Sequence, residues 1–111
     1  MPHLEGNEPI HPILTRLRSV IEELGPDVSA EESPTSVAFS RGSLFAVLEP
    51  ASPTRLDVGL VLAEADTSER LRPAGELGPR SITHRVSLAH EDEIDAELTG
   101  WLRAAYSGAT T

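Results

Sequence analysis

The sequence contains no cysteine and no lysine. Without cysteine there can be no zinc–thiolate site, iron–sulfur cluster, thiol nucleophile or disulfide, and without lysine there is no amine for a Schiff base. Only four residues are aromatic, so the core must be built mainly from Leu, Val, Ile and Ala. No apolar run approaches the roughly 20 residues that span a bilayer, and nothing at the N-terminus has the pattern of a signal peptide. We therefore expect a cytoplasmic protein that makes no membrane contact.

Acidic residues outnumber basic ones, with 18 Asp and Glu against 9 Arg and a formal net charge of −9. Binding to nucleic acid requires a basic face that neutralises phosphates, so we expect no nucleic-acid partner. A chain of 111 residues is long enough for one core and too short for two. We divide it into a flexible N-terminus at residues 1–9, a single α+β domain at 10–107 and a C-terminal tail at 108–111.

The spacing of apolar residues predicts the elements. Residues 10–24 are apolar at every third or fourth position, which indicates an amphipathic helix. Gly25 and Pro26 are expected to end this helix. The period then changes to two, and strands are predicted at residues 28–32, 35–40, 44–49, 54–63 and 82–88. Gly42 lies between the second and third strands, where a positive φ would suit a hairpin turn.

The predicted strands differ in burial. The continuous apolar run at 44–48 predicts a strand buried on both faces, and Pro50 is expected to end it. The clean alternation at 54–63 predicts a half-buried strand. Residues 64–80 are rich in charge, Pro and Gly. Asp66 and Glu69 resemble a capping box that would begin a short helical turn ending at Leu71, and the remainder is predicted to be a loop.

The last strand and the last helix complete the predicted fold. The apolar face of the strand carries Ile82, His84, Val86 and Leu88. Its polar face carries Thr83, Arg85 and Ser87. The apolar positions of the helix are Ile94, Leu98, Trp101, Leu102 and Ala105. The fold class is α+β, with an N-terminal helix, a four- to five-stranded mainly antiparallel sheet and a C-terminal helix packed on the sheet.

The histidines and carboxylates between residues 81 and 95 have structural explanations. His84 lies among apolar neighbours, which is typical of a hydrogen-bonded core histidine, although a ligand or base is the alternative. An extended strand would separate His84 from His90 by about 20 Å, so we expect no shared metal. The run from His90 to Glu93 fits the start of a helix, because carboxylates favour the positive end of the helix dipole. We predict no metal, no cofactor and no catalytic residue.

The arginines around the long loop form the candidate site. Arg70, Arg72, Arg80 and Arg85 are close in the chain and could converge on an anion, since guanidinium groups bind carboxylate or phosphate through two parallel hydrogen bonds. The alternative is that they pair with the carboxylates of the same segment. The predicted ligand-binding residues are Arg70, Arg72, Arg80, Thr83, His84 and Arg85.

The order of several sequence segments resembles a known family. These segments are ELGPDV, SVAFS, LFAVLEP, THRV and WLRAAY. They are similar to a bacterial domain-of-unknown-function family, number five-six-five-five, some relatives of which are loosely labelled predicted transport proteins. The resemblance extends from about Pro12 to Tyr106. It implies a compact cytoplasmic α+β domain and supplies no catalytic residues.

Three functions remain as hypotheses. The first is a non-enzymatic module that binds a small anionic ligand or a protein partner. The second is a small enzyme that uses His84 as a base and Arg85 as an anion clamp, and the third is a metal-binding protein. The short strand that begins near Val28 is expected to lie at a sheet edge, where it could pair with a second copy in a homodimer.

Overall fold

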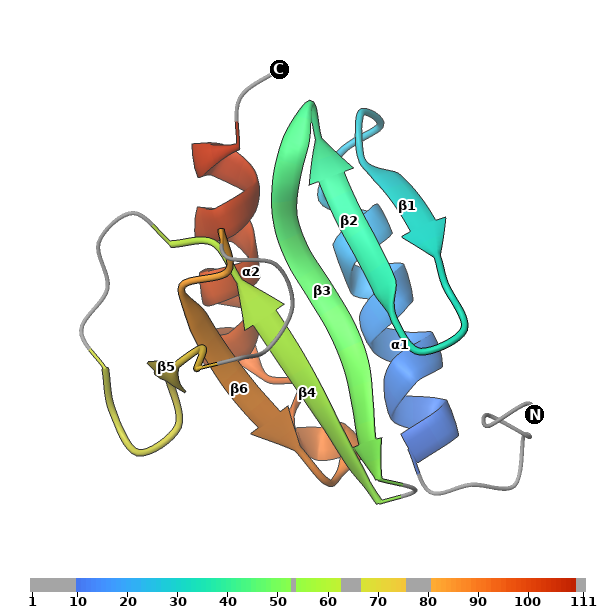
Figure 1. Cartoon of the computed structure of the whole chain (residues 1–111), viewed down its shortest axis with the longest axis vertical. Helices are drawn as coiled ribbons and strands as arrows, with labels where there is room; N and C mark the ends of the chain where they lie inside the picture. Colours follow the sequence, from blue (N-terminus) through green and yellow to red (C-terminus); the bar gives the residue numbers. More distant parts are fainter. Residues whose placement is uncertain (1–9, 53, 63–66, 76–80, 110–111) are drawn as a thin grey trace.

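The computed structural model describes residues 10–52, 54–62, 67–75 and 81–109. The helices are α1 (Ile10–Glu22) and α2 (Ala96–Gly108), preceded by a short 3-10 helix, η1 (Glu91–Glu93). The strands are β1 (Ser29–Glu32), β2 (Val37–Arg41), β3 (Ser43–Ser52), β4 (Arg55–Leu60), β5 (Arg72–Pro73) and β6 (His84–Leu88). Their arrangement is shown in Figure 1.

The strands form one antiparallel sheet in the order β1-β2-β3-β4-β6-β5, and α1 and α2 both lie on the same face of it (Figure 1). This confirms the α+β class, with six strands where four to five were expected. The main core lies between the sheet and the helices. It includes Leu17, Phe39, Leu48, Val58 and Leu102, each with no exposed surface.

The first helix and the first hairpin follow the sequence pattern. Helix α1 buries Ile13, Leu17 and Ile21, which recur every four residues and so share one face. The turn between β2 and β3 has Gly42 at φ +78°, a conformation that costs glycine little because it lacks a Cβ. The predicted strand burial at residues 44–48 is also confirmed, since residues 45–48 are buried and Leu44 is half-buried.

Two predictions about the central strands are wrong. Strand β3 continues through Pro50 to Ser52, with an irregular register between these two residues; a bulge is one of the places where a sheet tolerates proline. Strand β4 is not half-buried, because residues 56–60 are all buried. Asp57 can be buried there because Ser87 Oγ donates to its carboxylate at 2.7 Å and Arg55 forms an ion pair with it at 3.4 Å.

The segment before β6 also differs from the prediction. Arg72 and Pro73 form β5 instead of belonging to a loop, and residues 67–71 are not helical; Asp66 lies outside the described residues. Ile82 does not share a face with Val86. It precedes β6 and packs with Val47 and Ala74 in a second, smaller cluster. The strict alternation therefore begins at His84, two residues later than the sequence suggested.

The last helix starts later than predicted. The run from His90 to Glu93 does not begin it; residues 91–93 form η1, and α2 begins at Ala96. Asp95 is the N-cap residue of α2, and its side chain accepts a hydrogen bond from Leu98 N. A carboxylate at this position satisfies a backbone donor that has no partner within the helix.

Candidate functional site

The candidate site lies where β5 pairs with β6 at the edge of the sheet. The register places Arg72 directly opposite Arg85, and Gly59 of β4 lies opposite Arg85 on its other side. Residues that face each other in an antiparallel pair project from the same face of the sheet. Val86 and Leu88 belong to the core under the helices, so alternation directs Arg72 and Arg85 to the opposite face.

The pairing of two arginines is unusual in its electrostatics. Like charges directly opposite each other on neighbouring strands are destabilising. Neither Arg72 nor Arg85 forms an ion pair with any other residue that the structure describes. Arg72 is exposed and Arg85 is half-buried. The register therefore places two arginines opposite each other, and a bound anion would relieve the repulsion between their charges.

Arg70 has a different role. Its Nη1 donates to Asp95 and to Glu97, and its Nη2 donates to the carbonyl oxygen of Glu93. Its guanidinium also lies over the ring of Trp101, 5.7 Å from the centroid. Partial burial opposes ionisation, but the hydrogen bonds to Glu97 and Asp95 outweigh it and raise the pKa of Arg70. Arg70 is thus held by ion pairs, but its partners are carboxylates of α2 and its cap and not those of its own segment.

Thr83 and His84 contact the chain at the end of β4 and just beyond it. Thr83 Oγ1 accepts a hydrogen bond from Leu62 N at 2.9 Å and lies 2.7 Å from Nδ1 of His84. His84 is half-buried and lies opposite Leu60 on the core side of β6. His84 and Arg85 are consecutive strand residues and project from opposite faces. This geometry does not place a His84 base and an Arg85 clamp on one substrate. Arg80, the remaining predicted residue, lies outside the described residues.

Two hollows adjoin Arg72. One, of about 590 Å³, is lined by Thr67, Ser68, Glu69 and Arg72. The other, of about 350 Å³, is lined by Glu69, Arg70, Arg72, Ser87 and Glu93. Glu69 and Ser87 are not among the predicted ligand-binding residues. Ser87 could have been found, because it lies two residues after Arg85 and so projects from the same face.

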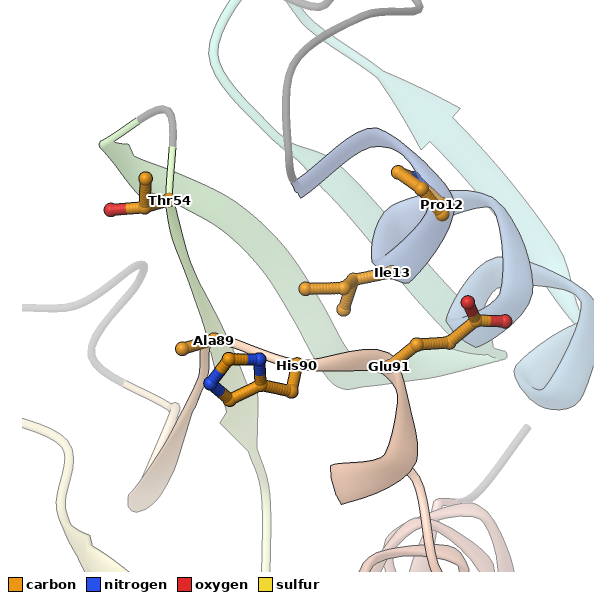
Figure 2. Close-up of a pocket in the computed structure, with 6 residues that line it drawn as sticks. All are labelled: Pro12, Ile13, Thr54, Ala89, His90 and Glu91. Atoms are coloured by element: carbon orange, nitrogen blue, oxygen red, sulfur yellow. The ribbon is translucent and has the colours of Figure 1, made fainter.

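A third hollow, of about 510 Å³, lies at the opposite end of β6 and is lined by Pro12, Ile13, Thr54, Ala89, His90 and Glu91. Figure 2 shows Ile13 and the His90 ring directed into it. The Glu91 carboxylate turns toward α1 instead (Figure 2) and forms an ion pair with Arg16 at 3.5 Å. Among the residues that line this hollow, His90 has the only ionisable ring. The carboxylate of Glu91, which could have served as its acid–base partner, is turned away from it.

In the acidic run that follows His90, the side chain of Glu93 accepts hydrogen bonds from the backbone. Glu93 Oε1 accepts hydrogen bonds from the N–H groups of Ala89 and His90, at 2.7 and 2.9 Å. Burial works against ionisation of Glu93, but these two hydrogen bonds lower its pKa. Within the described ranges, no three His, Asp or Glu side chains are placed to hold a metal ion. None of the helices described is long and apolar enough to cross a membrane.

Comparison with known proteins identifies the family. No curated protein and no solved structure matches this chain. A family model described as Domain of unknown function (DUF5655) matches residues 2–109. The chain therefore belongs to this family.

Proposed function

We propose that this DUF5655 member is a non-enzymatic binding domain that holds a small anionic ligand at Arg72 and Arg85. The observation that carries the proposal is their register: two arginines lie directly opposite each other on β5 and β6. Guanidinium groups are suited to carboxylate and phosphate because each can donate two parallel hydrogen bonds. An anion between them would convert a repulsive pair into an attractive site.

The size and charge of the surroundings favour a small ligand. The hollows beside Arg72 have volumes of about 590 and 350 Å³, within or near the range of small-molecule sites. The chain as a whole carries a net charge of −9, which opposes an extended polyanion such as nucleic acid. A cytoplasmic location and a protein partner stay predictions of the sequence.

A thermal-shift screen of the purified chain tests the proposal. The panel would contain acetate, propionate, citrate, inorganic phosphate and pyrophosphate at matched ionic strength. A ligand at about 100 times its Kd adds about 2.7 kcal/mol to the free energy of unfolding. In a domain of this size, that stabilisation raises the melting temperature by about ten degrees. We expect at least one anion to produce a shift of this order.

Matched variants locate the effect. Arg72→Gln and Arg85→Gln should abolish the shift and leave the unliganded protein folded, because neither side chain forms an ion pair with any described residue. Arg103→Gln removes the same charge from the exposed surface of α2 and should leave the shift unchanged. An equal response in Arg72→Gln, Arg85→Gln and the wild-type chain would disprove the site.

A further inference from the structure

The segment that carries Arg72 is held in place by its own residues. Ser68 Oγ accepts hydrogen bonds from the N–H groups of Arg70 and Leu71, at 3.3 and 3.0 Å, and Ser68 N donates to the carbonyl of Leu71 at 2.8 Å. Leu71 is only 1% exposed, and Arg70 is bound to α2 and its cap. These hydrogen bonds and the burial of Leu71 hold the backbone of this short stretch in one conformation.

The same segment carries two opposite charges, those of Glu69 and Arg72. Glu69 and Arg72 are both exposed, and together they line both of the hollows at this edge of the sheet. Neither forms an ion pair with any residue in the described part of the chain, and they do not pair with each other. A carboxylate and a guanidinium therefore line the same two hollows.

These charges decide which anion suits the site. A simple anion bound to Arg72 would be repelled by the carboxylate of Glu69 nearby. A ligand that carries an ammonium group as well as a carboxylate would be attracted by both residues. The other carboxylate of the 350 Å³ hollow, Glu93, already accepts two backbone hydrogen bonds through Oε1, which leaves Glu69 as the acceptor for such a group.

We infer that the ligand is a small zwitterion of the α-amino acid class, an inference that rests on the proposed anion site. Its carboxylate would lie on Arg72 and Arg85, and its ammonium group on Glu69. Ser87 lines the same hollow and donates its hydroxyl hydrogen to Asp57 at 2.7 Å. The lone pairs of Ser87 Oγ are therefore oriented to accept a further hydrogen bond, such as one from the ammonium group.

Titration with two matched pairs of probes tests the inference. The pairs are L-alanine with propionate and L-leucine with 4-methylpentanoate, and within each pair only the amino group differs. Backbone amide shifts in NMR spectra of the full chain would be followed to saturation. We expect the amino acid of each pair to bind about fivefold more tightly, the ratio that corresponds to about 1 kcal/mol for one exposed ion pair.

The variants separate this inference from the anion site itself. Glu69→Gln should remove the preference for the amino acid and preserve or strengthen the binding of propionate, while Arg72→Gln should weaken all four probes. Glu23→Gln, at an exposed position beyond the end of α1, is the charge control and should change neither. Equal affinities within both pairs for the wild-type chain would overturn the zwitterion and leave the anion site standing. Failure of all four probes, together with no thermal shift from any anion of the panel, would overturn both.

Discussion

At the scale of single residues, one contact joins three distant parts of the chain. Tyr106 of α2 donates its hydroxyl to Asp27 at 2.7 Å, and Arg41 of β2 donates to the same carboxylate at 2.8 Å. These two hydrogen bonds, that of Tyr106 foremost, lower the pKa of Asp27. The Arg41 guanidinium also lies over the Tyr106 ring, 4.4 Å from its centroid. The closeness of this packing explains why residue 25 is a glycine.

We predict that Gly25→Ala destabilises the fold. A Cβ at this position would lie 2.0 Å from Tyr106 Oη and 2.7 Å from its Cζ. The ring would have to move, which would break its hydrogen bond to Asp27 and disturb its edge contact with Phe45. Overpacking of this kind costs about 1–3 kcal/mol, and urea denaturation followed by circular dichroism would measure it.

The control for this variant is Gly100→Ala in α2. Among the described residues, no heavy atom lies within 4 Å of a Cβ built at Gly100, apart from its chain neighbours and the nearby backbone of its own helix. Alanine is favoured over glycine by about 0.5–1 kcal/mol in a helix interior. Gly100→Ala should therefore stabilise the protein. The same loss of stability in both variants would show that Tyr106 does not limit the space at Gly25.

At the scale of the elements, the start of α2 is joined to the segment before β5. Asp95 accepts a hydrogen bond from Leu98 N at 3.1 Å and another from Arg70 Nη1 at 3.0 Å. The Leu98 hydrogen bond foremost, and then that of Arg70, lower the pKa of Asp95 below its ordinary value of 3.8. One carboxylate thus caps the helix and holds the segment before β5 against it.

We predict a pH-dependent effect of Asp95→Asn. Asparagine is as good a helix cap as aspartate, so the variant removes mainly the charge. Because the pKa is lower in the folded than in the unfolded state, the carboxylate adds stability above pH 3.8 and loses it as the pH falls through the folded-state value. Melting temperatures measured between about pH 2 and 7 should show the variant below the wild-type chain at neutral pH, with the two converging in acid.

Asp92→Asn is the matched control for this series. Asp92 is an exposed residue of η1, three positions before Asp95. Its replacement changes the net charge by the same amount, and we expect it to leave the melting temperature at neutral pH nearly unchanged. A constant difference between Asp95→Asn and the wild-type chain at every pH would mean that the charge of Asp95 contributes nothing.

At the scale of the whole molecule, an open sheet edge favours self-association, and the acidic residues on that edge oppose it. Strand β1 lies at one end of the sheet, and all four of its residues are exposed. An exposed edge strand can pair with the same strand of a second copy. Glu31 and Glu32 occupy half of this strand, and Glu32 also forms an ion pair with Arg18 at 2.6 Å. Pairing of two copies would bring the carboxylates of both together.

We predict that the charge on β1 limits self-association. Like charges across a strand pair are destabilising, so Glu31→Gln should increase the dimer fraction in sedimentation velocity experiments at neutral pH. Salt should act in the same direction on the wild-type chain, because it screens exposed charges. Glu23→Gln removes one charge outside the strand and should have little effect. A dimer fraction that is the same for Glu31→Gln and Glu23→Gln would exclude β1 as the dimer edge.

The sequence by itself determined the elements that depend on local pattern. Helix α1, the hairpin at Gly42 and the α+β class all follow from spacing, turn chemistry and burial period, which act within a few residues. These predictions hold because each depends on interactions between close neighbours in sequence.

Only the tertiary structure decided which arginines form ion pairs within the described part of the chain. Arg70 forms ion pairs with carboxylates 25 and 27 residues away, and nothing local distinguishes it from Arg72. The two-residue strand β5 is too short to show a period, yet its register places Arg72 opposite Arg85. The face on which Ile82 packs depends on where β6 begins. Long-range pairing sets each of these features, because the energy of a contact depends on distance in space rather than on separation along the chain.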